Sequence, residues 1–308
     1  MYGISNNNLK KSMRKCLLWE MGNIFNEYAN LVKYHEMLGT FKVVGVTSDV
    51  SIYSKVKGYT YISKNNLKCS DFEIIIIMAQ DNALKAIYSE ALHMGIRKEN
   101  IFSYHVLKQE NFDIDKYMRI KKNPPSIFSN TCWGGITYHS LDLEFTSPLI
   151  NMYESTTDYL KLLRNPHKYM EEKLEFIETG YDIYAKKNFP IIKCGDIKLY
   201  FNHYDSFEDA RDCWERRKLR IDWDNLFVMM HTDNPRLAKE FVSLPYKKKI
   251  CFVPFESEET SLVYVELCEK TKTELWPLVT GMATGRYPYY DVFDLVEKGK
   301  LTKIVEFN

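Results

Sequence analysis

The stretch 72-FEIIIIMA-79 contains four consecutive isoleucines. An uninterrupted apolar run of this kind indicates a strand that is buried on both faces, as a central strand of a parallel sheet is. The next segment, 81-DNALKAIYSEALHMG-95, opens with an aspartate and closes on a glycine, which is typical of a helix. A doubly buried strand followed by a helix predicts an α/β fold.

The segments on either side extend this alternation. Strands are predicted at 14-RKCLLW-19, 41-FKVVGVTS-48 and 100-NIFSYHVL-107, and a helix is predicted over 23–38, where Gly39 ends it. Because parallel strands need crossover connections of one hand, the alternation favours a Rossmann-like parallel sheet. We assign this first domain to residues 13–120.

A second α/β domain is predicted after a break. The segment 121-KKNPPS-126 is basic and contains two prolines, which disfavour helix before them. Beyond it, strands alternate with helices, and we predict a three-layer α/β domain over residues 126–308. Its predicted strands are 126–130, 197–204, 225–231 and 249–255, and its predicted helices are 156–165, 206–220 and 235–243.

Composition excludes several classes of partner. The chain of 308 residues has 42 basic and 41 acidic residues, so its net charge of +1 gives no global field toward nucleic acid. The longest apolar run, 74–79, is far shorter than the roughly 20 residues of a membrane span. Seven scattered cysteines without CxxC spacing predict no metal site and suit a reducing compartment. We therefore expect a cytoplasmic protein.

The first turn of the Rossmann-like unit is a candidate cofactor site. In 19-WEMGN-23, Gly22 and Asn23 would approach a pyrophosphate, and Asp49 would accept a ribose hydroxyl. A dinucleotide fingerprint has three glycines, whereas this turn has one, and Glu20 would repel phosphate. Two interpretations stay open, a nucleotide site and a unit that only scaffolds or dimerises.

The segment 129-SNTCWGGITYH-139 is the first candidate substrate site. It follows a predicted strand, and adjacent glycines permit positive φ and close approach of a ligand to the backbone. Amides at a helix start favour an anion, and a helix start lowers the pKa of a cysteine thiol. The alternative is a tight turn with the tryptophan buried as packing. The candidate residues are Asn130, Cys132, Trp133, Gly134, Gly135 and His139.

A second candidate lies in 202-NHYDSFEDARDCWERRKLR-220. His203 at a strand end would act as a general base, with Asp205 orienting it. Arg216, Arg217 and Arg220 would bind phosphate or carboxylate, although cations also complement a helix C-terminus. The two Asp-x-Asp motifs, 113-DID-115 and 222-DWD-224, are weak signals of a metal-dependent glycosyltransferase.

These motifs resemble a bacterial family labelled exopolysaccharide biosynthesis protein, whose characteristic domain has no assigned function. The resemblance covers about residues 125–255. The segments that carry it are 130-NTCWGGITYHSLDLEFTSPLINMY-153, 157-TDYLKLL-163, 203-HYDSFEDA-210, 214-WERRKLRI-221 and 225-NLFV-228. The matching positions are Asn130, Cys132, Trp133, Gly134, Gly135, Ser147, Pro148, His203, Tyr204, Trp214, Arg216, Arg217 and Arg220.

The resemblance implies an activated or lipid-linked sugar as substrate class. Some members carry a Rossmann-like domain in front with W-G-x-G at its first turn, where this chain has Trp19-Glu20-Met21-Gly22. Our first hypothesis is a group transferase acting on a sugar or sugar phosphate, with Trp133 or Tyr204 facing the sugar and the cofactor unknown. The alternatives are a non-catalytic binding or assembly protein, possible as a homo-oligomer, and a nicotinamide-dependent oxidoreductase.

Overall fold

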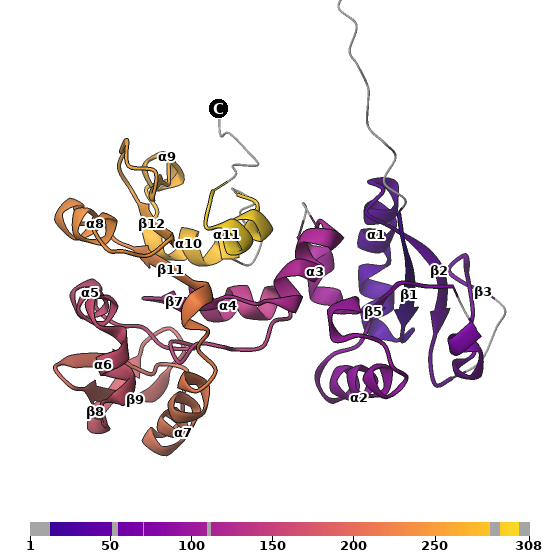
Figure 1. The fold of residues 1–308 in the computed structure, drawn as a ribbon, viewed down its shortest axis with the longest axis horizontal. Helices are drawn as coiled ribbons and strands as arrows, with labels where there is room; N and C mark the ends of the chain where they lie inside the picture. The colour runs from indigo at the N-terminus through magenta and orange to yellow at the C-terminus, as the bar shows by residue number, and fades with distance from the viewer. Residues whose placement is uncertain (1–12, 51–54, 70, 110–111, 284–289, 302–308) are drawn as a thin grey trace, which may run out of the picture. The chain divides into compact units, whose positions relative to one another are not determined.

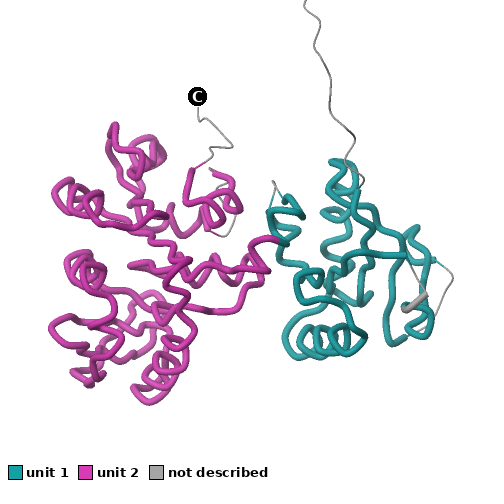
Figure 2. Tube along the Cα trace, in the orientation of Figure 1, with its two compact units in different colours: residues 1–118 teal, residues 119–308 magenta. Residues whose placement is uncertain are grey.

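The computed structural model describes residues 13–301 except 51–54, 70, 110–111 and 284–289. The chain divides into two compact units, residues 1–118 and 119–308 (Figure 2). Both units are α/β, and each contains a parallel sheet, which confirms the predicted fold class. The predicted junction at 121–126 lies just after the point where the units separate.

The sheet of the first unit has four parallel strands in the order β2-β1-β5-β6, of which β2, β1 and β5 are labelled in Figure 1. Helix α1 follows β1, and helix α2 follows β5, as the alternation predicted. The bounds are β1 Arg14–Trp19, α1 Asn23–Met37, β2 Phe41–Thr47, β5 Ile74–Ile77, α2 Asp81–His93, β6 Ile101–Ser103 and α3 Ile114–Lys122, with a small β3–β4 ladder of Lys55–Val56 and Tyr59–Thr60.

The four isoleucines form the centre of this sheet. Strand β5 lies between β1 and β6, and all four of its side chains are fully buried. Because side chains alternate along a strand, Ile75 and Ile77 join one core with Ile87 and Ala91 of α2, and Ile74 and Ile76 face the other side. The prediction of a doubly buried strand is confirmed.

The predicted strand 100–107 is only half a strand. β6 ends at Ser103, and a 3₁₀ helix follows at Tyr104–Lys108. The apolar residues of this segment are buried against α1 rather than paired in the sheet, and the buried ring of His35 donates from Nε2 to the carbonyl of Leu107 at 2.9 Å. An apolar run alone does not distinguish these two forms of burial.

The second unit contains a parallel sheet in the order β13-β12-β11-β7. Its strands are β7 Ser126–Ser129, β11 Leu226–His231, β12 Lys248–Val253 and β13 Leu262–Tyr264. The helices are α4 Trp133–Ser140, α5 Thr156–Arg164, α6 Pro166–Glu171, α7 Phe207–Lys218, α8 Pro235–Val242, α9 Leu267–Thr271, α10 Leu275–Ala283 and α11 Val292–Lys298. Ser155 and Ser206 cap α5 and α7 through their side chains.

An antiparallel sheet with the order β10-β9-β8 completes the second unit. Its strands are β8 Leu174–Asp182, β9 Lys187–Cys194 and β10 Ile197–Tyr200. β8 and β9 were not predicted, and the strand predicted over 197–204 ends at Tyr200, so that His203 lies in the loop that follows. One core joins the two sheets, with Ile192 and Leu199 packed in the same cluster as Phe128 and Val228.

No helix among the described residues is both long enough and apolar enough to cross a membrane.

Candidate functional site

Two of the candidate residues of the second unit, Cys132 and His203, meet at the carboxyl end of β7. The Sγ atom of Cys132 lies 3.3 Å from Nε2 of His203. Cys132 is partly buried and His203 is exposed, so a molecule from solvent can reach the pair. Ligands of parallel sheets bind at this edge. Two segments that were predicted separately therefore form one Cys–His pair.

The loop after β7 fixes the position of the thiol. The hydroxyl of Ser129 donates to the carbonyl of Thr131 at 2.7 Å and accepts from the amide of Gly134 at 3.0 Å. These two bonds close the turn between the strand and α4. Cys132 becomes the N-cap residue of α4, with its carbonyl accepting from the amide of Ile136 at 2.9 Å.

Partial loss of solvation keeps both members of the pair uncharged near neutral pH. Desolvation raises the pKa of the Cys132 thiol to about 11, and the carboxylates of Asp182 and Glu154 act in the same direction. Desolvation also lowers the pKa of His203. The predicted lowering of the thiol pKa by the helix start is wrong, because loss of solvation outweighs it. The thiol thus donates to a neutral imidazole, which is poised to accept its proton.

The acid beside His203 is Asp182, not Asp205. Asp205 pairs with Lys187 at 2.7 Å and is largely exposed. The charge of Asp182 raises the pKa of His203 against the effect of burial. The amides of Tyr184 and Ala185 both donate to Asp182 Oδ1 at 2.9 Å, and they hold the pKa of this carboxyl below its ordinary value. An ionised carboxylate therefore flanks the imidazole.

A buried carboxyl group lies within electrostatic range of the thiol. Glu154 is 4% exposed, and neither of its carboxyl oxygens has a hydrogen-bond partner. Burial raises its pKa well above the ordinary value, and the nearby Asp158 adds to the effect. A partnerless buried carboxyl group is costly in a folded protein. Such a group is typical of a functional site rather than of packing.

Asn130 joins the ends of two strands. Its Nδ2 donates to the carbonyl of His231 at 3.1 Å, and its Oδ1 accepts from the amide of His231 at 3.1 Å. The same Oδ1 lies 3.3 Å from Nδ1 of the His231 ring. Since an oxygen can only accept, Nδ1 carries the proton and Nε2 is left as an acceptor. Burial lowers the pKa of His231 to about 4, so this form persists at neutral pH.

The glycine pair serves packing rather than a positive-φ turn. Gly134 and Gly135 both lie inside α4, and neither has a positive φ. A Cβ at Gly134 would lie 2.8 Å from Ser129 Oγ, and one at Gly135 would lie 3.2 Å from Asn151 Oδ1. The expectation of positive φ is wrong, because the residues are needed for close approach of the helix to its neighbours.

Trp133 and Tyr204 do not present faces to a sugar in this structure. The Trp133 indole is fully buried and donates to the hydroxyl of Tyr290 at 2.9 Å. Tyr204 is 4% exposed and donates to the carbonyl of Ile150 at 2.9 Å. His139 lies in the last turn of α4, at the opposite end from Cys132. A helix of this length separates its ends by about 12 Å.

The three arginines are engaged within the protein. Arg217 is 8% exposed, donates to the hydroxyl of Tyr204 and lies 5.1 Å from the centre of the Phe145 ring. Arg220 pairs with Glu144 at 3.0 Å, and Arg216 donates to Cys213 Sγ at 3.3 Å. Arg217 was expected to bind phosphate, but its guanidinium group is buried and donates to Tyr204 instead of facing solvent.

The first turn of the first unit is filled by a side chain. Glu20 adopts a φ of 85°, and its Oε1 accepts from the amide of Met21 at 2.8 Å. The same oxygen would lie 3.9 Å from a Cβ on Gly22, the N-cap of α1, where Asn23 begins the helix. Asp49 pairs with Lys64. The carboxylate thus occupies the turn in which a pyrophosphate would lie, which argues against both the nucleotide site and the oxidoreductase.

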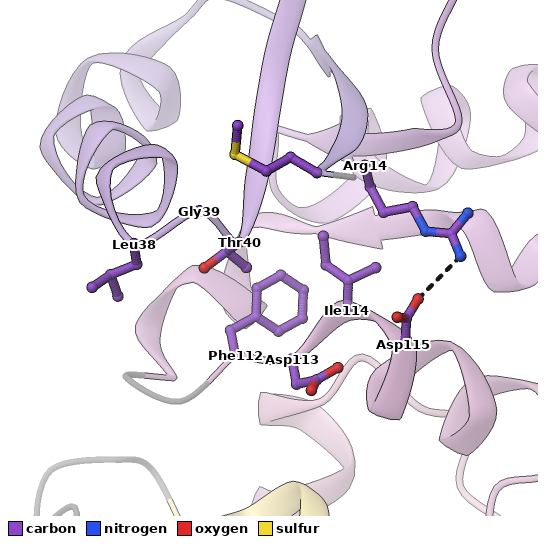
Figure 3. A pocket seen from close by; sticks show the side chains of 9 residues that line it. Arg14, Leu38, Gly39, Thr40, Phe112, Asp113, Ile114 and Asp115 are labelled. Atoms are coloured by element: carbon purple, nitrogen blue, oxygen red, sulfur yellow. Dashed lines mark hydrogen bonds and ion pairs between the residues drawn. The ribbon is translucent and has the colours of Figure 1, made fainter. Parts of the chain in front are cut away.

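The pocket of the first unit lies at the wrong edge for a Rossmann-type ligand. It has a volume of about 200 Å³ and is lined by Arg14, Leu38, Phe112 and Asp115, among others (Figure 3). Arg14 is the first residue of β1 and donates to Asp115 at 3.1 Å. Ligands of such sheets bind at the opposite, carboxyl end of the strands.

Neither Asp-x-Asp motif gathers a metal site. Asp113 accepts from the amide of Lys116 at 3.0 Å, and Asp222 accepts from the amides of Asp224 and Asn225. Their first aspartates therefore cap turns. Within the part of the chain that the structure describes, no group of three or more His, Cys, Asp or Glu side chains could hold a metal ion.

A larger pocket of about 670 Å³ opens in the second unit at the ends of β11 and β12. His231 and Thr232 line it where β11 ends, Pro254 where β12 ends, and Thr156 at the start of α5. None of these was predicted, nor were Asp182 and Glu154. His231 closes the strand 225-NLFVMMH-231, and the rule that singled out the strand end near His203 would also have found it.

Comparison with known proteins gives a family but no activity. Residues 103–298 match a family described as a domain of unknown function, DUF1919, and residues 12–102 match one described as C2185-like, N-terminal. An uncharacterized protein of Haemophilus influenzae is 30% identical over 200 residues, which is 62% of this chain and 93% of the relative. The first match spans more than half of the chain, and the protein therefore belongs to the DUF1919 family.

Proposed function

We propose that this protein is a group transferase of cell-surface polysaccharide assembly, acting in the cytoplasm on a sugar or sugar-phosphate substrate. The observation that carries the proposal is the 3.3 Å contact between Cys132 Sγ and His203 Nε2 at the carboxyl end of a parallel strand. A nucleophile within hydrogen-bond reach of a base, with a third group acting on the base, is the arrangement of covalent catalysis.

The geometry supports a two-step transfer. Cys132 sulfur attacks the transferred group of an activated donor, its proton passes to Nε2 of His203, and the bond to the leaving group breaks. His203 then gives that proton to the leaving group. In the second step a sugar hydroxyl attacks the group held on sulfur, its proton moves to Nε2, and the sulfur leaves and is reprotonated by His203. Asp182 stabilises the imidazolium that forms in each step.

The substrate class is supported by the sequence resemblance and by the position of the site. The motifs shared with exopolysaccharide biosynthesis proteins include Cys132 and His203, which the fold brings together. The larger pocket of the second unit has the size of a small-molecule site, since such pockets measure about 300–1,000 Å³.

The test is formation of a covalent adduct on Cys132. The protein is incubated separately with nucleotide sugars and with acyl thioesters, and its intact mass is measured with peptide mapping. We expect a mass increase on Cys132 with one donor class, lost in Cys132→Ala and retained in Cys213→Ala, a matched change at another partly buried cysteine. Absence of any adduct across both donor classes would favour the non-catalytic binding protein.

A further inference from the structure

The pocket of the second unit has exposed aromatic side chains at its rim. Trp276, at the start of α10, lines the pocket and is 46% exposed. Tyr184, in the turn between β8 and β9, is 81% exposed, and its ring centre lies 6.4 Å from that of Trp276. Exposed apolar surface at the rim of a pocket can mark a ligand-binding groove. Trp276 is held in place by a bond from Nε1 to Glu274 at 2.8 Å.

Three connections link the lining of this pocket to residues that act on the Cys–His pair or precede it in the chain. Tyr184 is two residues from Asp182, which acts on both Cys132 and His203. His231 lines the pocket and is bonded to Asn130, two residues before Cys132. Thr156 lines the pocket two residues after Glu154, the buried partnerless carboxyl group that acts on the thiol.

The pocket lining combines hydroxyl-binding groups with one stacking face. Nε2 of His231 is a neutral acceptor, because Asn130 fixes the proton on Nδ1. Thr156 and Thr232 supply hydroxyl groups, and Trp276 supplies the apolar face. A flat apolar face together with several neutral acceptors and donors in one pocket matches a sugar ring, which has an apolar C–H face and hydroxyls around its edge.

The charge of the lining selects among sugars. The charged side chains of the lining are three acids, Asp233, Glu269 and Glu274, and one base, Lys272. A pocket with this excess of negative charge repels phosphate and carboxylate and accepts a neutral or amino sugar. The phosphate-bearing part of a donor therefore does not belong in this pocket.

We propose that this pocket is the acceptor subsite of the enzyme and binds a neutral or amino saccharide. The sugar ring stacks on Trp276 beside Tyr184, and its reacting hydroxyl lies toward Cys132. The role of the bound saccharide as acceptor rests on the proposed transferase function. Binding of the saccharide in the pocket does not depend on that function. It assigns a subsite to residues that the shared sequence motifs do not include.

The experiment is a saccharide titration of the full chain, followed by saturation-transfer NMR and by tryptophan fluorescence. The probes are lactose, N,N′-diacetylchitobiose and a disaccharide that contains glucuronic acid. We expect a neutral probe to bind, Trp276→Ala to weaken it at least about tenfold, and Trp276→Phe to restore part of the affinity. Trp276 is exposed, so both variants should fold. Tighter binding of the glucuronate probe than of both neutral probes would overturn the charge argument.

Cys132→Ala separates this inference from the proposed function. It should leave saccharide binding unchanged while removing the covalent adduct. Saccharide binding that depends on Trp276, without any adduct on Cys132, would support the subsite and overturn the transferase. An adduct on Cys132 without saccharide binding, or binding that survives Trp276→Ala at full strength, would overturn the subsite.

Discussion

Asn130 bonds His231 at three points, through the carbonyl, the amide and the ring nitrogen Nδ1 of the histidine. This ties the end of β7 to the end of β11 and sets which ring nitrogen of His231 carries the proton. The contact therefore couples the loop of the nucleophile to the wall of the pocket.

Replacing Asn130 tests this coupling. Asn130→Ala removes the partners of a partly buried histidine, and we expect a loss of about 1–3 kcal/mol in the free energy of unfolding, measured by urea denaturation. Asn130→Asp instead places a negative charge against Nδ1, which favours the charged ring. We expect NMR titration to show the pKa of His231 rising from about 4 by about 1–3 units. An unchanged pKa in Asn130→Asp would show that the ring contact is not made.

Glu154→Gln should stabilise the protein at neutral pH. The folded-state pKa of Glu154 is raised by burial, so the unfolded chain releases a proton that the folded chain retains. Stability therefore falls as pH rises above the ordinary glutamate pKa, by up to about 1.4 kcal/mol per pH unit until the folded pKa is reached. Glutamine does not titrate and escapes this loss.

The measurement is denaturant unfolding of both proteins at about pH 4 and at pH 7.5. The gain from Glu154→Gln should be largest at pH 7.5 and should nearly vanish at about pH 4, where the carboxyl is mostly protonated in both states. Asp205→Asn, at an exposed and paired acid, is the control and should show little such pattern. A Glu154→Gln variant that is less stable at pH 7.5 would mean that the carboxylate is ionised and bound.

Gly134→Ala should destabilise the protein through one contact. The new Cβ would lie 2.8 Å from Ser129 Oγ, and we expect a cost of about 1–3 kcal/mol, measured by thermal or urea unfolding. Ser129→Ala removes that oxygen and with it the bond to the Gly134 amide. If the clash is the cause, the double variant is less destabilised than the sum of the single variants. Additive effects would place the cost elsewhere in α4.

Arg217→Ala should act on stability before it acts on binding. The guanidinium group is buried against Tyr204 and Phe145, so its removal opens a cavity and leaves Tyr204 without this donor. We expect a loss of about 2–4 kcal/mol in urea unfolding. Arg220→Ala, at an exposed ion pair, should cost less than about 1 kcal/mol. Full stability in Arg217→Ala with loss of a phosphate ligand would restore the phosphate-binding role.

Local sequence patterns were sufficient for the four strands of the first parallel sheet and for β7, β11 and β12 of the second, whereas the three-residue strand β13 was not predicted. The isoleucine run and the strand at 14–19 depend on residues a few positions apart. The antiparallel hairpin of β8 and β9 was not predicted from the sequence, because most of β8 is exposed and carries no continuous apolar face. The alternation of apolar and polar residues reveals a strand only when one face of the strand is buried.

The site was predicted in parts but not as a whole. Cys132 and His203 were each singled out, yet their contact joins positions 71 residues apart. The partner of His203 was assigned to the neighbouring Asp205, whereas the fold supplies Asp182 from another strand. Burial, which decides the pKa of Cys132 and removes Trp133 and Arg217 from solvent, depends on the whole core and leaves no local signal.

The bond from His35 to Leu107 has a consequence for where the chain can be divided. The DUF1919 match begins at residue 103, but residues 103–118 belong to the first structural unit. They supply the carbonyl for the buried His35 ring and the aromatic rings of Phe112 and Tyr117 that pack on Phe102. A fragment that ends at residue 102, just before the family match begins, would therefore expose the buried His35 and Phe102 side chains of the first unit. Residues 103–118 thus belong to the family domain by sequence and to the first unit by packing.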